Sequence, residues 1–279
     1  MTSQYPSPDP YTQPTQTPPS DRPALAPLAG RTNTEYDTYS DQFERYTAFW
    51  DRLDPTFSDW IAAQMPARPG HGDRAIDLGC GGGRHSVLLA EHYAHVLAVD
   101  IADGMLGIAR NAHNRDNITY QHTDVLAVTP LRNGTFDAVL AVDVLRTVGG
   151  PELVLPHIRS LVAARGVAIL VDMIDPGGWA HPGFHVDRAF TESRAAYELS
   201  GDRHAAADVL RLLLHDRWLR QAADHPPLTR ERFHQAYQQA FPGAQITDLN
   251  PLMSAAVWHS PATVGPYYPT TEYAGQARR

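Results

Sequence analysis

The chain of 279 residues contains no lysine, so all 23 of its basic side chains are arginines. Without lysine there is no P-loop lysine for nucleotide phosphates and no Schiff-base lysine for pyridoxal phosphate. The formal net charge is −8 and the sequence has no basic run. Because nonspecific affinity for nucleic acids depends on neutralising phosphates, we expect no nucleic-acid partner.

Cysteine and long apolar runs are equally scarce. Cys80 is the single cysteine of the sequence, which excludes an intrachain disulfide and a cysteine-cluster metal site. No stretch approaches the roughly 18 to 20 uninterrupted apolar residues that a membrane span needs. The first residues also lack the basic start and apolar run of a secretory signal. We therefore expect no membrane partner and a cytoplasmic location.

The two ends of the chain differ in composition from its middle. Residues 1–30 are rich in Pro, Ser, Thr and Gln and nearly uncharged, which predicts disorder because such a segment buries too little apolar surface to offset its ordering entropy. Residues 261–279 are predicted to be flexible in the same way. Residues 31–260 are predicted to form one domain.

From Arg74 onward, the pattern of strand, glycine turn and helix repeats. The predicted strands are residues 75–78, 95–99, 118–121, 136–142, 167–171, 245–249 and 253–258, and the fourth of them is almost wholly apolar. The predicted helices between the first five strands cover residues 85–93, 104–112 and 152–163. This alternation predicts an α/β fold with a doubly wound, seven-stranded, mostly parallel sheet.

Further helices are predicted on both sides of this pattern. Aromatic residues recur at steps of three and four along the segment before it, at Tyr36, Tyr39, Phe43, Tyr46 and Trp50. This spacing places them on one helical face, which we interpret as an N-terminal lid helix. Residues 190–199, 204–223 and 229–241 also look helical, and we expect them to form a helical cap insertion over about residues 173–242.

The most informative string is Ala-Ile-Asp-Leu-Gly-Cys-Gly-Gly-Gly-Arg-His-Ser at residues 75–86. Glycines after a strand let the backbone turn sharply and let a ligand approach closely. The dinucleotide-binding fingerprint requires glycine at the sixth position of the loop, where this chain has Arg84. An acidic residue, Asp77, instead stands directly before the loop.

Gly-x-Gly-x-Gly preceded by Asp-Leu resembles motif I of the class I (Rossmann-like) S-adenosylmethionine (SAM)-dependent methyltransferases of small-molecule type. The resemblance extends to Asp100 at the end of the second strand, to Asp124-Val125 after the third, to Phe136-Asp137-Ala138-Val139 and to residues 165–170. It implies SAM as cofactor and methyl transfer to O, N or C of a small-molecule acceptor, for example in secondary metabolism.

The resemblance also implies which residues hold SAM. In the family, an acid at the position of Asp100 binds both ribose hydroxyls, and apolar residues near positions 101–105 and 125 contact the adenine. The implied cofactor-binding residues are Tyr39, Asp77, Gly79, Cys80, Gly81, Asp100, Ile101, Met105, Asp124, Val125 and Ala141.

The catalytic residues are less clear from the sequence. His181 and His185 follow the fifth strand, where family members place substrate-facing residues, and histidine titrates near neutral pH. Tyr36 offers a hydroxyl at the start of the lid helix. The family often has histidine where this chain has Arg146, so the chain departs from the family's pattern there. The other histidines that we considered are predicted to be structural: His85, His204, His215 and His234.

Several alternatives remain open. Asp143, Asp172 and Asp175 follow strands where catechol-type enzymes hold Mg²⁺, although we predict no metal. Asp143-Val144-Leu145-Arg146 replaces the Asp/Asn-Pro-Pro-aromatic motif of nucleobase amino methyltransferases. Cyclisation or elimination of SAM, or a noncatalytic SAM-binding module, would use the same fold, and a homodimer is compatible with the sequence.

Overall fold

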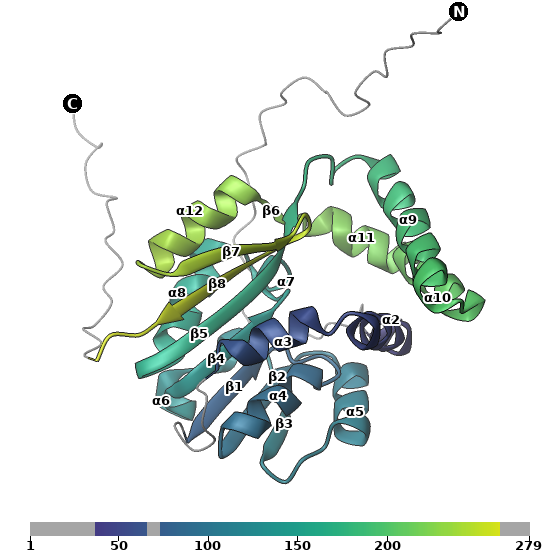
Figure 1. Cartoon of the computed structure of the whole chain (residues 1–279). Coiled ribbons are helices and arrows are strands. Elements are labelled where there is room, and N and C mark those ends of the chain that lie inside the picture. The colour runs from purple at the N-terminus through teal and green to yellow at the C-terminus, as the bar shows by residue number, and fades with distance from the viewer. Residues whose placement is uncertain (1–36, 66–72, 263–279) are drawn as a thin grey trace, which may run out of the picture.

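The computed structural model describes residues 37–65 and 73–262 (Figure 1). The predicted disordered tail over residues 1–30, nearly all of the predicted C-terminal tail and Tyr36 lie outside these described residues.

The centre of the molecule is a mostly parallel sheet, as predicted (Figure 1). Its strands are β1 (Arg74–Leu78), β2 (His95–Asp100), β3 (Ile118–His122), β4 (Phe136–Val142), β5 (Val162–Asp175), β7 (Gln245–Asn250) and β8 (Met253–His259). They are arranged in the order β3-β2-β1-β4-β5-β8-β7, and β8 runs antiparallel to both of its neighbours. All seven predicted strands are confirmed. An additional two-residue strand, β6 (Leu228–Thr229), pairs with the end of β5 and was not predicted.

Helices cover both faces of this sheet because successive strand residues point to opposite sides. Ile76 and Leu78 of β1 belong to the core cluster under α8 (Pro151–Leu161) and α12 (Arg230–Ala240). Ala75 belongs to the cluster on the other face, which contains residues of α3, α4 and α5. These three helices are α3 (Thr56–Ala63), α4 (Arg84–His92) and α5 (Asp103–Ala112). The remaining short helices are η1 (Val125–Ala127), α6 (Pro130–Asn133) and α7 (Leu145–Val148).

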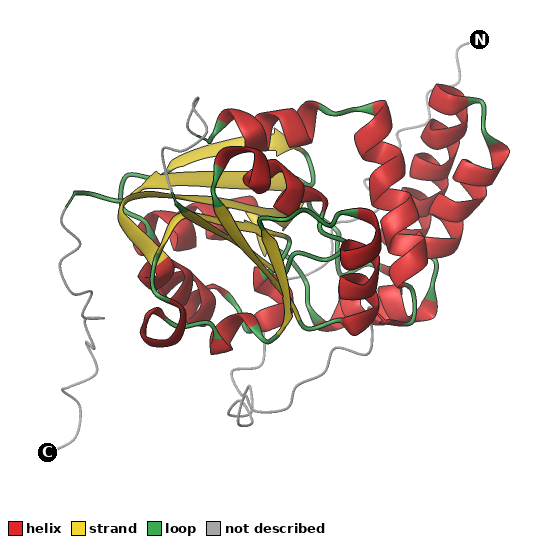
Figure 2. Cartoon of the chain, turned by 90° about the horizontal axis from the view of Figure 1, so that it is seen from below, coloured by secondary structure: helices red, strands yellow, loops and turns green. Residues whose placement is uncertain are grey.

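A separate group of helices lies beyond one end of the sheet (Figures 1 and 2). It consists of α2 (Ser40–Leu53), α9 (Pro182–Ser200), α10 (Arg203–Leu213) and α11 (Asp216–Asp224). Phe49 of α2 packs with Ala189, Leu212 and Trp218 in a core cluster of their own. The predicted lid helix and helical cap therefore exist, and they pack against each other.

The cap is shorter than the sequence predicts. The segment 204–223 is two helices, because the chain turns at His215, whose side chain accepts a hydrogen bond from the Arg217 backbone N–H and so caps α11. The next helix, α12, is not part of the cap, because Phe233 and Tyr237 are buried in the core beneath the sheet. The cap helices therefore span residues 182–224.

Across the part of the chain that the structure covers, every helix is too short or too polar to traverse a lipid bilayer.

Candidate active site

The glycine loop forms a tight turn at the carboxyl end of β1. The backbone N–H groups of Gly79 and Cys80 donate to the Val99 carbonyl over 2.8 and 2.9 Å, which ties the loop to β2. Gly79 has a φ of +69°, a conformation that side chains other than glycine rarely adopt. A Cβ atom on Gly79 would also lie 2.6 Å from Cγ2 of Val144, so both the backbone conformation and the available space require glycine.

Asp100 lies at the end of β2, beside this loop. Its two carboxylate oxygens accept hydrogen bonds from the backbone N–H groups of Gly81 and Ala102, each over 2.8 Å. Burial raises the pKa of the carboxyl, against the effect of these hydrogen bonds. Because a carboxylate can accept about four hydrogen bonds, Asp100 keeps capacity for two adjacent hydroxyl groups of a ligand.

The ends of β1, β2 and β4 open into a first cavity of about 560 Å³. Seven of the predicted cofactor-binding residues line it: Gly79, Gly81, Asp100, Ile101, Met105, Asp124 and Val125. Across from the strand ends, its wall is formed by Phe43 of α2 and by Arg220, Gln221 and Asp224 of α11. The cavity thus lies between the sheet and the cap.

This cavity has the chemistry that an adenosine group needs. Asp100 offers carboxylate oxygens to a ribose diol, and the side chains of Ile101, Met105 and Val125 provide apolar contact for a planar base. Asp124 accepts from the Leu126 backbone N–H with Oδ1, and its carboxylate keeps capacity to accept from an exocyclic amine. The volume also lies within the usual range for small-molecule sites, roughly 300 to 1,000 Å³.

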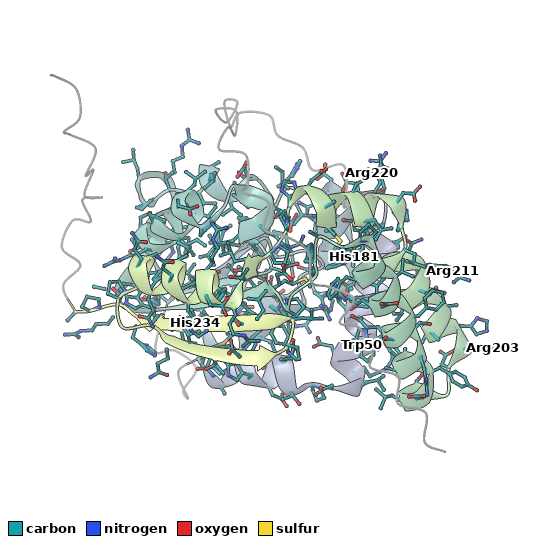
Figure 3. The ribbon with its side chains drawn as sticks, turned by 90° about the horizontal axis from the view of Figure 1, so that it is seen from above. Trp50, His181, Arg203, Arg211, Arg220 and His234 are labelled. Carbon is teal, nitrogen blue, oxygen red and sulfur yellow. The ribbon has the colours of Figure 1, made fainter. Side chains whose placement is uncertain are left out.

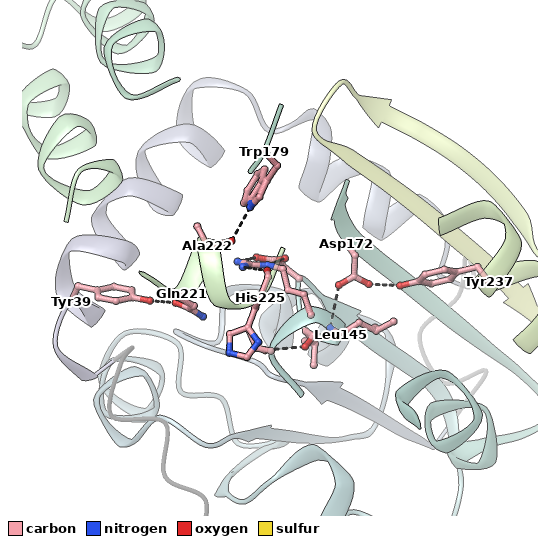
Figure 4. Close-up of polar contacts among 12 residues, drawn as sticks. Tyr39, Leu145, Asp172, Trp179, Gln221, Ala222, His225 and Tyr237 are labelled. Carbon is pink, nitrogen blue, oxygen red and sulfur yellow. Dashed lines mark hydrogen bonds and ion pairs between the residues drawn. The ribbon is translucent and has the colours of Figure 1, made fainter. Parts of the chain in front are cut away.

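The other predicted cofactor-binding residues are placed differently. Asp77 and Cys80 line a second cavity rather than the first. Ala141 is fully buried within β4, between β1 and β5, and lines neither cavity. Tyr39 is also buried and lines neither, but its hydroxyl donates to the side-chain oxygen of Gln221, which does line the first cavity (Figure 4). The structure therefore places Tyr39 and Ala141 behind the cavity walls, and their role in binding the cofactor stays a prediction.

The contact between Tyr39 and Gln221 yields a prediction. We expect Tyr39→Phe to lower the free energy of unfolding by about 1 to 3 kcal/mol, because it leaves the buried Gln221 oxygen without this donor. We also expect a loss of affinity for S-adenosylhomocysteine that is smaller in free energy than the loss of stability, because Gln221 forms part of the cavity wall. Urea unfolding and calorimetric titration with S-adenosylhomocysteine test both effects. A Tyr197→Phe variant, altered at a tyrosine that is 53% exposed, is the control.

The second cavity, of about 570 Å³, adjoins the first. Five residues line both cavities: Phe43, Gly79, Gly81, Val142 and Asp143. Asp143 has a φ of +54°, which is strained for a residue other than glycine, and such strain often marks functional sites. The Arg146 guanidinium holds both oxygens of Asp143, over 2.8 and 3.0 Å. Arg146 therefore orients a carboxylate at the junction of the two cavities.

The predicted catalytic histidines do not face these cavities. His181 is the N-cap of α9, where its Nδ1 accepts from the Gly183 backbone N–H. His185 contacts the Trp179 carbonyl through Nε2 over 2.9 Å and packs against the Trp179 ring. Neither residue lines either cavity, and their catalytic role stays a prediction. His85, which was predicted to be structural, lies in α4 as expected and also lines the second cavity.

The three acids considered as metal ligands have other partners. Asp143 pairs with Arg146. Asp172 accepts from the Tyr237 hydroxyl and from the Leu145 backbone N–H (Figure 4). Asp175 accepts from the Gly177 and Trp179 backbone N–H groups. Within residues 37–65 and 73–262, no group of three potential ligands could hold a metal ion.

Sequence reasoning missed several cavity residues. Gln221 and His225 of the α11 segment line the first cavity, and Arg188 and Glu192 of α9 line the second. Their positions follow from how the cap folds back over the strand ends, and no local motif marks them. Tyr46, one of the aromatic residues of the predicted lid helix, also lines the second cavity, so the aromatic spacing gave a partial signal.

The strand order, the single antiparallel strand β8 and the glycine loop beside Asp100 agree with the fold that the resemblance to class I SAM-dependent methyltransferases implies. Residues 76–170 match the family described as a methyltransferase domain.

Named relatives agree with this class. The chain is 32% identical over 120 residues to a ubiquinone biosynthesis O-methyltransferase of Xanthomonas campestris pv. campestris, an alignment that covers 42% of this chain and 49% of that protein. It is 28% identical over 144 residues to a demethylmenaquinone methyltransferase of Clavibacter sepedonicus, covering 49% of this chain and 58% of the relative. The chain thus spans about half the length of the curated relatives that it matches.

The fold is also found in a solved structure, that of phosphoethanolamine N-methyltransferase 2 of Haemonchus contortus in complex with S-adenosyl-L-methionine. The TM-score is 0.57 at 10% sequence identity, and the match covers 82% of this chain and 59% of that chain. At this identity the likeness shows a shared fold.

Proposed function

We propose that this protein transfers a methyl group from SAM to an oxygen, nitrogen or carbon atom of a small-molecule acceptor. The observation that carries the proposal is the convergence of seven motif residues on one cavity at the carboxyl ends of the parallel strands. Ligands of doubly wound sheets bind at this edge. The two curated relatives are named for steps of quinone biosynthesis, which supports a small-molecule acceptor.

The residues of the first cavity would hold the adenosine part of SAM. Asp100 would accept hydrogen bonds from the two ribose hydroxyls, Ile101 and Val125 would contact the adenine ring, and Asp124 would accept from its amino group. Gly79 and Gly81 line both cavities and carry no side chain that would block a ligand extending from the first cavity into the second.

SAM, when bound, supplies a methyl group attached to a positively charged sulfur atom, and this sulfur is the leaving group of an in-line displacement at the methyl carbon. The protein's main contribution to such a reaction is to hold donor and acceptor in line, which can be worth roughly 7 to 11 kcal/mol of the barrier. The Asp143 carboxylate, oriented by Arg146, supplies negative charge at the junction of the two cavities. The lid helix α2 and cap helix α11 close the first cavity on the side opposite the strands.

An assay with methyl-labelled SAM and a panel of phenols, amines and enols tests the proposal. We expect stoichiometric formation of S-adenosylhomocysteine and a labelled, methylated acceptor, with heat-denatured protein as the control. Consumption of SAM without a methylated product would instead indicate cyclisation or elimination of SAM. Tight binding of SAM with no turnover of any kind would support the noncatalytic module.

The predicted cytoplasmic location, the absence of a nucleic-acid partner and the possible homodimer stay predictions.

A further inference from the structure

The wall of the second cavity is mainly aromatic and apolar. Large side chains from the lid helix, from α3, from the cap and from the sheet line it: Phe43, Tyr46, Trp50, Phe57, Met173, Trp218, Leu252 and Met253. Figure 3 shows Trp50 on α2, on the side of the molecule where α9 and α10 lie. Flat aromatic rings on several sides of one space favour a planar apolar ligand.

One polar cluster interrupts this wall. Arg188 of α9 donates through Nε to Glu192 over 2.6 Å, and the Tyr46 hydroxyl of α2 donates to the other oxygen of Glu192 over 2.6 Å. The Arg188 side chain is only 12% exposed. Its Nη1 is buried and has no hydrogen-bond partner among the described residues.

Two other residues that line this cavity also carry a buried polar atom without a partner within the described ranges. Trp50 Nε1 and His85 Nε2 are also without a hydrogen-bond partner in the described part of the chain. Trp50 and Arg188 both contact Tyr46, since the rings of Tyr46 and Trp50 lie 6.4 Å apart and Arg188 Nη2 donates to the Tyr46 hydroxyl. Buried polar groups in proteins are nearly always paired. Two of these three atoms, Trp50 Nε1 and Arg188 Nη1, are hydrogen-bond donors, which indicates a ligand that carries hydrogen-bond acceptors.

The charges around the cavity favour an uncharged ligand. Arg188 is already neutralised by Glu192, and Arg84, the other arginine of the wall, lies 3.6 Å from Glu44 and 3.0 Å from Asp51. Burial lowers the pKa of His85 to about 4, so that its imidazole is neutral at pH 7. Acidic residues outnumber arginines in the lining. A carboxylate on the ligand would therefore find no free cation among the described lining residues.

We propose that the second cavity binds the methyl acceptor, and that the acceptor is an uncharged, planar aromatic compound whose carbonyl or hydroxyl oxygen accepts hydrogen bonds from Arg188 Nη1 and Trp50 Nε1. The identification of the ligand as the acceptor rests on the proposed function. The binding of such an aromatic compound in the second cavity is argued from the residues that line this cavity and does not rest on the proposed function.

Calorimetric titration of the full chain tests this inference with two probes, beta-naphthol and the hydroxynaphthoic acid that adds one carboxylate to the same rings. We expect naphthol to bind and the acid to bind at least about tenfold more weakly. Trp50→Phe keeps an aromatic ring but removes the Nε1 donor, and Arg188→Lys keeps the charge but removes the Nη1 donor. Each variant should weaken naphthol binding by about threefold to tenfold, the effect of losing one hydrogen bond.

The control is Arg194→Lys, at an arginine of α9 that is 80% exposed, and it should bind naphthol as the unaltered protein does. Failure of naphthol to bind, equal binding of the acid, or unchanged affinity in both Trp50→Phe and Arg188→Lys would overturn the inference. Titration with S-adenosylhomocysteine in parallel separates the two proposals. If that ligand binds and naphthol does not, the inference fails while the proposed function stands. If naphthol binds and S-adenosylhomocysteine does not, the proposed function fails.

Discussion

Replacing Asp100 by alanine is expected to weaken the binding of SAM and of S-adenosylhomocysteine by about 100-fold or more. The proposed contact is two hydrogen bonds from ribose hydroxyls to one carboxylate, and hydrogen bonds to charged groups contribute roughly 1.5 to 3 kcal/mol each. The substitution also removes the acceptor that fixes the Gly81 and Ala102 N–H groups, which adds to the loss. Isothermal titration of each ligand into the purified variant measures the effect.

Two further variants make this result interpretable. The Asp103 side chain is 69% exposed and lines neither cavity. Asp103→Ala should therefore leave the affinities for SAM and S-adenosylhomocysteine unchanged. Asp100→Asn keeps one oxygen acceptor, and its affinity for both ligands should lie between those of the unaltered protein and of Asp100→Ala. Equal affinity of Asp100→Ala and the unaltered protein, with both folded by circular dichroism, would place the ribose elsewhere.

The second large effect concerns the pH dependence of stability. Asp77 accepts from the Ser86 hydroxyl over 2.6 Å, and Asp172 accepts from the Tyr237 hydroxyl. Both carboxyls are buried, and this burial raises the pKa of each to about 7 despite these hydrogen bonds. The protonated, neutral form of each is therefore favoured in the folded state.

The sign of the effect follows from proton binding. Between about pH 4 and pH 7 the folded chain holds protons on these two groups that the unfolded chain has already released. The contribution of each carboxyl to stability is therefore fully present below about pH 4 and is lost as pH rises to 7. A pKa rise of about three units corresponds to at most about 4 kcal/mol per carboxyl.

The variants Asp77→Asn and Asp172→Asn should remove this dependence, because an amide keeps hydrogen-bonding capacity and carries no charge. We expect each variant to gain stability relative to the unaltered protein as pH rises from 5 to 8, by about 2 to 4 kcal/mol. Urea unfolding across this range measures the difference, and Asp103→Asn is the exposed control. Stability curves that run parallel for the unaltered protein and both variants would contradict the account.

The sequence was sufficient to predict the sheet and to predict that most of the motif residues would meet at one cavity, and there is a physical reason for each. Strands such as β4, buried on both faces, are nearly continuous apolar runs, which stand out against the amphipathic helices that connect them. The glycine loop and Asp100 follow directly on strands β1 and β2, so their meeting at one sheet edge follows from the parallel arrangement alone.

The cap side of the two cavities depends on contacts that no local pattern encodes. Tyr46 reaches Glu192 across 146 positions of sequence, and Tyr39 reaches Gln221 across 182. His181 and His185 follow β5 as expected. However, His181 caps the start of α9, and His185 contacts the Trp179 carbonyl. Where a cap folds back over the strand ends, tertiary packing decides which side chains face the cavity.

A crystal structure of the chain with bound S-adenosylhomocysteine tests the central claim most directly. The account predicts the ribose hydroxyls within hydrogen-bond distance of the Asp100 carboxylate, and the adenine between Ile101 and Val125 in the first cavity. The ligand bound outside this cavity, or the ribose turned away from Asp100, would contradict it.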